Sequence, residues 1–262
     1  MDKLAKYGSL AGRRVFVTGG GSGIGEAIVS AFVAQGAVVA FVDIVADASE
    51  ALVARLTASL ESGPQCTRHA PLFRYCDITD IPALQATMAE LADKLGDFDV
   101  VVNNAANDQR HQIGDVTPAY YDERIAINQR PMFFTVQAAL EGMKRRGGGS
   151  VINFSSMSFH AKNPGYPVYA ATKAAVTGLT RCLARDLGPF NIRVNTVTPG
   201  WVMTQRQVEL WLDEAGEAEI RRAQCLPGKL MSEDIAAMVL FLAADDSKMC
   251  TAQDFVVDAG WT

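Results

Sequence analysis

The sequence predicts an α/β fold in which one domain, residues 1–262, forms a doubly wound sheet of about seven parallel strands with helices on both faces. Short apolar runs alternate with longer segments that are apolar at helical spacing, which favours parallel strands joined by crossover helices. A glycine-rich turn joins the first run to the first helical segment. With 262 residues, 49% of them hydrophobic, the chain can bury one large core. The expected strands are 13–18, 37–42, 72–77, 98–102, 151–155, 191–197 and 254–257, and the expected helices are 26–35, 47–62, 81–95, 118–146, 167–187 and 232–244.

The turn between residues 18 and 26 has the context of a dinucleotide site, because a strand precedes it and a helix follows it. Its glycines follow Gly-x-x-x-Gly-x-Gly, so the backbone can approach a pyrophosphate, and the helix N-terminus offers N–H donors. This context predicts a sheet of the Rossmann type, although a plain strand-to-helix connection would also use glycine. The expected cofactor contacts in the turn are Gly19, Ser22, Gly23, Ile24 and Gly25.

Asp43, at the end of the second strand, predicts NAD rather than NADP as the cofactor. A carboxylate there can accept hydrogen bonds from both hydroxyls of the adenosine ribose. It would repel a 2′-phosphate, and neither Ser22 nor Ile44 supplies a cation to offset that repulsion. We therefore expect Asp43 and Ile44 to contact NAD. The alternative is a turn residue near the next helix, a role that Asp47 could equally fill.

The third and fourth strands also end in polar residues. The third strand follows a turn at Gly63-Pro64 and ends in Asp77, and Asp77 and Ile78 are candidates for the adenine edge. The generic alternative is that Asp77 or Thr79 caps the helix that begins near residue 81. Because ligands lie at the carboxyl edge of a parallel sheet, the residues directly after the fourth strand are candidate cofactor contacts. They are Asn104 and Ala105.

The helix over residues 118–146 is expected to break near Asn128 and Pro131. Proline cannot donate a backbone hydrogen bond and displaces its partner carbonyl, so the asparagine can bond freed backbone groups or water. A structural role at this kink is enough to explain Asn128.

Tyr169 and Lys173 lie four positions apart in an alanine-rich segment, so a helix places both side chains on one face. The ammonium is expected to lower the pKa of the phenol, which otherwise, at roughly 10, is a poor base at neutral pH. Ser156, thirteen residues earlier, could hold a substrate oxygen against the phenol. Tyr-x-x-x-Lys is also a common surface pair on helices, so the pair alone does not establish a site.

After the sixth strand, Pro199-Gly200 lets the backbone approach a nicotinamide. Residues 201–222 are expected to form a helical, lid-like insert over the substrate. Trp201, Arg206 and Trp211 could stack on or bond a sugar, whereas packing into the core or an interface is the alternative for tryptophan. The apolar-aromatic tail from Asp258 to Thr262 is expected to dock against another subunit.

Taken in order, these motifs resemble the short-chain dehydrogenase/reductase family over essentially the whole chain. They are Thr18-Gly-Gly-Gly-Ser-Gly-Ile-Gly25, Asn103-Asn-Ala105, Asn128, Ser156, Tyr169-x-x-x-Lys173 and Pro199-Gly200. The resemblance implies that Tyr169 is the base and that Lys173 also bonds the nicotinamide ribose. It implies that Ser156, rather than Ser155 or Ser158, holds the reacting oxygen and that Asn128 joins a proton relay to Lys173. It further implies cofactor contacts at Pro199, Gly200, Val202 and Thr204, substrate contacts at Asn107 and Ser158, and a homodimer or homotetramer.

Five shorter segments resemble bacterial aldose 1-dehydrogenases of this family, such as D-xylose and L-arabinose dehydrogenases, which oxidise the anomeric carbon to a lactone. They are Asn107-Asp-Gln-Arg-His111, Tyr121-Asp-Glu-Arg124, Gly142-Met-Lys-Arg-Arg-Gly147, Ala223-Gln-Cys-Leu226 and Asp258-Ala-Gly-Trp261. The expected substrate is thus a free sugar, since buried donors left unpaired by an apolar substrate would weaken binding. The alternatives are a 3-oxoacyl or small-ketone reductase, a class that more often takes NADP, and a nucleotide-sensing protein.

Charge and composition exclude other classes of function. A net charge of -5 with interspersed signs argues against nucleic acid and anionic membranes as partners. The start of the chain has no apolar signal-peptide core, no apolar run reaches membrane-spanning length, and three histidines without ligand spacing predict no metal site. The cysteines, odd in number and scattered, predict reduced thiols and a cytoplasmic protein. They are Cys66, Cys76, Cys182, Cys225 and Cys250.

Overall fold

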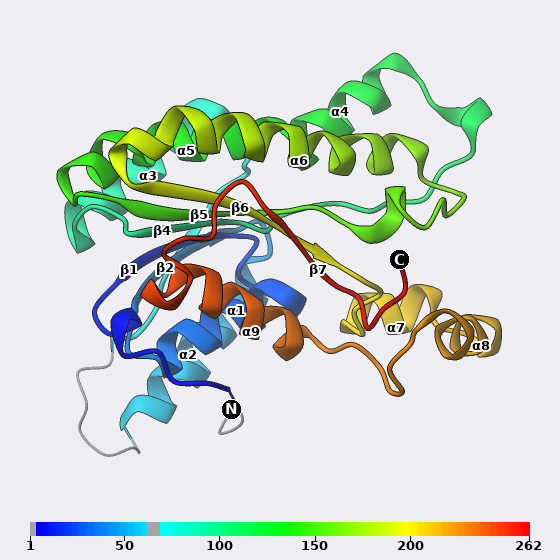
Figure 1. Ribbon diagram of the computed structural model, residues 1–262, viewed down its shortest axis with the longest axis horizontal. Helices are drawn as coiled ribbons and strands as arrows, with labels where there is room; N and C mark the ends of the chain where they lie inside the picture. Colours follow the sequence, from blue (N-terminus) through cyan, green and yellow to red (C-terminus); the bar gives the residue numbers. More distant parts are fainter. Residues whose placement is uncertain (1–3, 62–68) are drawn as a thin grey trace.

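The computed structural model describes residues 4–61 and 69–262, and its centre is a sheet of seven parallel strands (Figure 1). The strand order is β3-β2-β1-β4-β5-β6-β7, so the order reverses between β1 and β4. The expected turn at Gly63-Pro64 and Cys66 lie outside the described residues. The predicted α/β class and parallel sheet are confirmed. The strands are β1 (Arg14–Thr18), β2 (Val38–Asp43), β3 (Leu72–Tyr75), β4 (Val100–Asn103), β5 (Gly149–Phe154), β6 (Ile192–Pro199) and β7 (Asp254–Val257).

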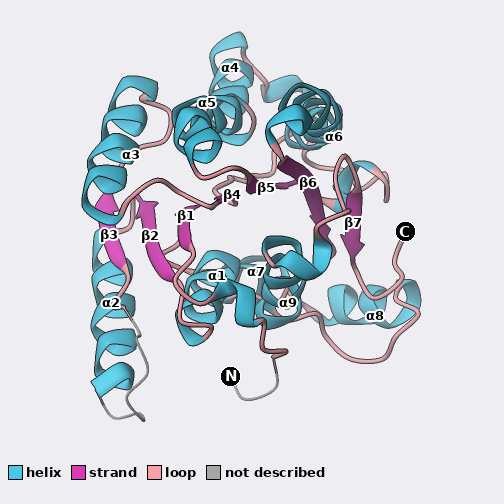
Figure 2. Ribbon diagram, turned by 60° about the vertical axis from the view of Figure 1, so that its left-hand side comes forward, coloured by secondary structure: helices cyan, strands magenta, loops and turns pink. Residues whose placement is uncertain are grey.

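Helices cover both faces of the sheet (Figure 2). The layer of α1, α2 and α9 lies on one face, and the layer of α3, α4, α5 and α6 lies on the other. The helices are α1 (Gly23–Ala34), α2 (Ala46–Glu61), α3 (Ile81–Leu95), α4 (Pro118–Asn128), α5 (Arg130–Arg145), α6 (Pro167–Leu187), α7 (Gln205–Trp211), α8 (Glu214–Ala223) and α9 (Ser232–Ala243).

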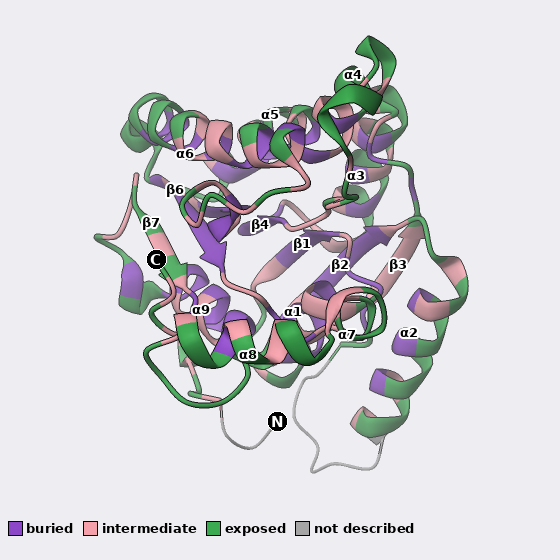
Figure 3. Ribbon diagram, turned by 90° about the vertical axis from the view of Figure 1, so that its right-hand side faces the viewer, coloured by how far each residue is buried: buried purple, intermediate pink, exposed green. Residues whose placement is uncertain are grey.

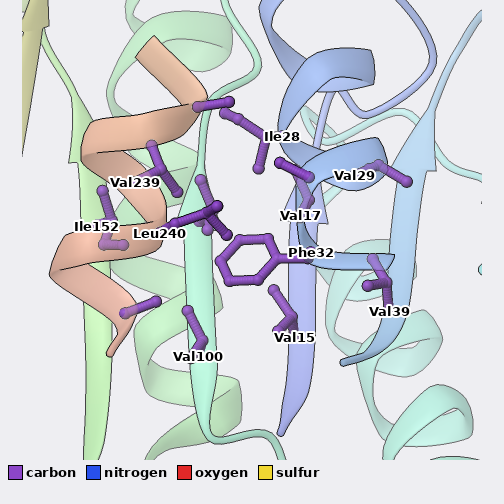
Figure 4. Packing of buried hydrophobic residues seen from close by; sticks show 14 of the residues in the cluster. Val15, Val17, Ile28, Val29, Phe32, Val39, Val100, Ile152, Val239 and Leu240 are labelled. Atoms are coloured by element: carbon purple, nitrogen blue, oxygen red, sulfur yellow. The ribbon is translucent and has the colours of Figure 1, made fainter. Parts of the chain in front are cut away.

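Two apolar layers hold these helices to the sheet. On the first face, Phe32 of α1 packs among Val15, Val100 and Leu240, which come from β1, β4 and α9 (Figure 4). On the second face, α3, α5 and α6 pack against the other side of the same strands, with Val101 and Val151 fully buried. The strand interiors are therefore nearly continuous apolar runs, as a parallel sheet covered on both faces requires.

The long helix expected over residues 118–146 is broken where predicted. Gln129 leaves helical geometry at φ -132°, and Pro131 supplies no N–H. Met132 donates to the Gln129 carbonyl rather than to that of Asn128. The break therefore frees the Asn128 carbonyl from the pattern of a continuous helix.

The helix cap considered for Asp77 or Thr79 is wrong. Asp80, and neither Asp77 nor Thr79, caps α3 by accepting a hydrogen bond from the Ala83 N–H at 3.0 Å. The Asp77 carboxylate instead accepts from Thr79. At the start of α9, Asp234 accepts from the N–H of Met231.

The expected insert at residues 201–222 forms two short helices, α7 and α8. Both are largely exposed, and Ile220 is the one residue of α7 and α8 that is buried (Figure 3). They lie beyond the carboxyl ends of β6 and β7, near the C-terminus of the chain. Across residues 4–61 and 69–262, no helix has both the length and the apolar character needed to cross a membrane.

Candidate active site

A cavity of about 680 Å³ opens at the carboxyl edge of the sheet. Its walls come from the glycine turn, the loop after β4, the end of β5, helix α6, the segment after β6 and the C-terminus. This is the edge at which parallel α/β sheets bind ligands. The lining includes Ile24, Asn104, Asp108, Arg110, Ser156, Ser158, Tyr169, Lys173, Pro199, Gly200, Trp201, Val202, Thr204, Gln207, Trp211 and Trp261.

Tyr169 and Lys173 project from one face of α6 into this cavity. The Lys173 Nζ lies 5.7 Å from the centre of the Tyr169 ring, and the phenol hydrogen-bonds to Ser156. Lys173 is only 1% exposed, and its ammonium donates to the Phe154 carbonyl at 2.9 Å. Helical spacing thus brings the pair together, and the end of β5 brings the serine to the phenol.

The expectation that Lys173 lowers the pKa of the Tyr169 phenol is wrong. Burial, with a smaller contribution from the charge of Asp108, raises the pKa of Tyr169 above its ordinary value, although the Ser156 hydrogen bond opposes the rise. Burial also lowers the pKa of Lys173 to about 7, so its amine is only partly charged at neutral pH. A cation that is itself desolvated gives the phenolate less support than sequence spacing suggests.

The three neighbouring serines have different environments. Ser155 is buried and donates to the Lys173 carbonyl at 2.8 Å, which ties β5 to α6. Ser156 is partly exposed and accepts from the Ser158 N–H at 3.2 Å. Ser158 lines the cavity, and its buried hydroxyl has no partner among the described residues. Ser156 is therefore the serine that meets the phenol.

Asn128 is fully buried at the end of α4 and is bonded to the loop after β4. Its Oδ1 accepts from the N–H of Asn107 at 2.7 Å, and its Nδ2 donates to the Asn107 carbonyl at 3.1 Å. The Asn128 side chain thus holds the loop in place. Its backbone carbonyl, which the helix break leaves without the usual helical donor, can still accept a hydrogen bond.

The glycine turn is packed so tightly that it excludes side chains. A Cβ on Gly25 would lie 1.8 Å from the Gly19 carbonyl oxygen, and Gly19 itself has a φ of +67°. Asn104 reinforces the turn by donating to the carbonyls of Thr18 and Gly19. The N–H of Ala105 meanwhile donates to the Thr18 hydroxyl.

The first turn of α1 fits an anion. Ser22, at the N-cap, is exposed and makes no side-chain bond to the helix, so the N–H groups of Gly23, Ile24 and Gly25 remain available as donors. Thr204 lies beside this turn, because a Cβ on Gly23 would lie 3.2 Å from its methyl group. The donors and the close backbone suit a pyrophosphate.

Asp43 lies at the carboxyl end of β2, next to the glycine turn. Its two oxygens accept from the N–H groups of Gly21 and Val45, at 2.9 and 3.0 Å, and the residue stays partly exposed. Ile44 is 60% exposed beside it. Across the sheet edge Asp77 is exposed, whereas Ile78 is almost completely buried.

The segment after β6 forms the far wall of the cavity. Gly200 runs so close to the C-terminal segment that a Cβ would lie 2.7 Å from the Asp258 Cα. Val202 is buried, and Thr204 caps α7 by accepting from the N–H of Gln207. The indole of Trp201 donates to Gln207 at 3.0 Å.

The structure brings most of the sequence-predicted substrate residues to the cavity, but neither Asn107 nor Arg206. The Asn107 side chain folds back on its own turn to accept from the N–H of Gln109, and Arg206 is 56% exposed. Their neighbours Asp108 and Gln207 line the cavity instead.

Sequence reasoning missed further lining residues. Arg110 lies 3.9 Å above the ring of Trp211, and Trp261 meets Trp201 edge-on with ring centres 6.4 Å apart. The polar run after β4 was a signal for Asp108 and Arg110. Trp261 gave no such signal, since an aromatic chain end fits a subunit contact equally well.

Comparisons with known proteins find relatives over nearly the whole chain. A family model described as enoyl-(acyl carrier protein) reductase matches residues 19–262. The chain is 49% identical to D-xylose 1-dehydrogenase of Caulobacter vibrioides, over 98% of each chain, and 44% identical to a probable galactose dehydrogenase of Rhizobium meliloti, over 98% of this chain and 97% of that one.

Solved structures show the same fold. A short-chain type dehydrogenase/reductase from Mycobacterium ulcerans superposes with a TM-score of 0.89 at 27% identity, covering 98% of this chain and 91% of that one. A 7α-hydroxysteroid dehydrogenase complexed with NADH superposes with a TM-score of 0.88 at 30% identity, covering 97% and 95%. The chain belongs to the short-chain dehydrogenase/reductase family.

Proposed function

We propose that this oxidoreductase uses NAD to oxidise C1 of a free aldose, giving the lactone. The observation that carries the proposal is the group formed by Tyr169, Lys173 and Ser156 at the wall of a polar cavity beside the glycine turn. Retention of all three argues against a nucleotide-sensing protein, which has no need of a base.

The cofactor is proposed to lie along the carboxyl edge of the sheet. The first turn of α1 would hold the pyrophosphate, and Asp43 would hold the adenosine ribose and disfavour the 2′-phosphate of NADP. The same proposal gives adenine contacts to Ile44, Asp77 and Ile78. The nicotinamide half would be held by Asn104, Ala105, Lys173, Pro199, Gly200, Val202 and Thr204.

The protein's own part of the reaction is positioning and proton transfer. Ser156 would hold the C1 hydroxyl against Tyr169, which takes its proton as the C1–O bond gains double-bond character. A bound oxidised nicotinamide supplies the hydride acceptor and a positive charge that favours the phenolate.

The proton then has a route away from the phenol. With its pKa near 7, Lys173 can both hold and release a proton at neutral pH. The proton would then move on through water bound to the backbone carbonyl of Asn128, while the Asn128 side chain holds the loop.

The sugar assignment has two supports. Two of the most similar relatives are named for sugar oxidation. The cavity also combines aromatic faces with carboxylate, guanidinium and hydroxyl groups, which suit a polyol, since an apolar substrate would leave them unpaired. Substrate contacts are proposed for Ser156, Ser158, Tyr169 and Trp201, with Asn107 and Arg206 supporting the wall from outside.

We also propose a single catalytic domain with residues 201–222 as its lid, and a homotetramer or homodimer as the assembly. The cytoplasm is proposed as its compartment, since the four described cysteines are free thiols.

The experiment is NADH formation from a panel of free aldoses, run in parallel with NAD and NADP. We expect turnover of at least one pentose or hexose, with NAD preferred. Tyr169→Phe is the control: it should still bind NADH, yet lose nearly all turnover, about 10³-fold or more, because the proton acceptor is gone. Activity on a hydroxy-ester but on no sugar would show a 3-oxoacyl or small-ketone reductase instead. Turnover of Tyr169→Phe close to that of the unmodified chain would remove the proposed base.

A further inference from the structure

Asp108 places a carboxylate in the wall of the cavity, next to the proposed reaction centre. It belongs to the irregular loop after β4, and its side chain is 31% exposed. Its charge adds to the rise in the pKa of Tyr169 and opposes the fall in the pKa of Lys173, so it lies within electrostatic range of both groups. Acidic side chains are rare in cavities that bind apolar substrates, because desolvating an unpaired charge is unfavourable.

The protein leaves part of this carboxylate without a strong partner. Gln207 donates to Oδ2 at 2.6 Å. The ion pair of Oδ1 with the Arg206 Nε spans 3.6 Å, and the arginine is mostly in solvent. Two carboxylate oxygens offer about four acceptor sites, so Asp108 keeps capacity for donors that enter the cavity.

We propose that Asp108 is a specificity-determining residue that accepts hydrogen bonds from one or two ring hydroxyls of the substrate. The inference rests on the proposed function, because it requires a hydroxyl-rich substrate with its reacting carbon at Tyr169. A sugar replaces the water that Asp108 loses, whereas an acyl chain leaves the carboxylate unpaired. Asp108 thus favours sugars and rejects the substrates of the alternative enzyme class.

The alternative is that Asp108 has a purely structural role. Gln207 joins it to Trp201, because the Gln207 side chain donates to Asp108 and accepts from the indole. Asp108 could then act only by holding α7 in place. Loss of an anchor lowers activity on every substrate alike, whereas loss of a hydroxyl contact affects only substrates that carry that hydroxyl.

The experiment combines variants with substrate analogues. Asp108→Ala, Asp108→Asn and Gln207→Ala are compared on the best aldose and on its monodeoxy analogues, with kcat and KM measured separately. We expect Asp108→Ala to lower kcat/KM on the parent sugar about 10- to 100-fold, mainly through KM. On the analogue that lacks the contacted hydroxyl, the loss should shrink to about twofold or less. Asp108→Asn should fall between, since it keeps one acceptor oxygen, and unchanged NADH binding confirms that each variant is folded.

Two outcomes overturn the inference, and they are distinguishable. In the first outcome, the unmodified chain oxidises aldoses, but Asp108→Ala lowers kcat/KM by the same factor on the parent sugar and on every analogue. Gln207→Ala is expected to give this pattern, and it would show that Asp108 holds α7 in place and does not contact the substrate. If the unmodified chain oxidises no aldose, the proposed function fails and the inference fails with it.

Discussion

Lys173 is the residue whose burial is hardest to reconcile with stability alone. It is 1% exposed, and the one hydrogen bond of its ammonium among the described residues goes to the neutral Phe154 carbonyl. A buried ammonium without a carboxylate partner is strongly unfavourable, and the protein responds by lowering the pKa of the amine to about 7. Such a group persists where function needs a proton to be held and released near neutral pH.

The buried amine makes stability depend on pH in a defined direction. The folded-state pKa of Lys173, about 7, lies below its ordinary value of 10.5, so between these values the unfolded chain binds more protons than the folded one. The contribution of Lys173 to the free energy of unfolding therefore rises with pH in this window. Lys173→Met removes it. We expect the difference in unfolding free energy, unmodified minus variant, to grow in favour of the unmodified chain between pH 7 and about pH 9.

Urea unfolding at both pH values measures that difference. Tyr169 does not interfere, because its raised pKa keeps the folded phenol protonated throughout this range. Parallel pH dependences for the two proteins would show that Lys173 titrates with its ordinary pKa.

At the scale of elements, most of the fold follows from local pattern. Each buried strand is an apolar run and each helix an amphipathic segment, and these signals do not depend on distant contacts. What the pattern could not provide is the orientation of side chains in irregular loops. Asn107 and Asp108 are adjacent and both suit a turn, yet only Asp108 lines the cavity, because Asn128 holds the backbone of its neighbour. Neither strand nor helix periodicity applies there.

The turn between β1 and α1 gives the sharpest test of an element. A Cβ on Gly25 would lie 1.8 Å from the Gly19 carbonyl oxygen and 2.8 Å from Asn104 Nδ2, so the backbone itself would have to move. We expect Gly25→Ala to lose about 3 kcal/mol of unfolding free energy and most of its NADH affinity. Gly8→Ala is the matched control, since a Cβ there meets nothing within 4 Å and should change stability by less than about 0.5 kcal/mol. Urea unfolding and NADH fluorescence titration measure both; equal stability of the two variants would show that the turn can relax.

At the scale of the whole molecule, opposite ends of the helices meet the two edges of the sheet, because all the strands are parallel. The first turn of α1 directs its N–H groups to the carboxyl edge, where the cavity lies. At the amino edge, the carbonyls at the end of α9 take donors from outside the helix: Arg193 donates to those of Leu242 and Ala244, and Ser150 also donates to that of Leu242. Arg193 therefore bonds the negative end of α9 at the amino edge, whereas the positive end of α1 faces the cavity at the opposite edge.

The cavity also joins the two ends of the chain, since its walls run from the glycine turn near the start to Trp261. The order of motifs could predict the middle of this site, from the turn to residue 204. The last wall depends on how the C-terminal segment returns to the loop after α8, where the N–H groups of Cys225 and Leu226 donate to the Ala259 carbonyl. Such a contact between distant segments leaves no periodic signal in either one.

Trp261 is therefore expected to act on substrate binding rather than on folding. It lies outside the two buried apolar clusters, packs edge-on against Trp201 and lines the cavity. Trp261→Ala removes a wall that an aldose ring would contact, so KM for the sugar should rise about 10-fold while KM for NAD changes by less than about twofold. Phe190→Ala is the control, because Phe190 is an exposed aromatic that packs on Lys144, outside the cavity lining. Steady-state kinetics with each substrate varied in turn separate the two constants. A rise in both KM values, or a matching loss in Phe190→Ala, would mean that the tail supports the fold as a whole and not the substrate wall.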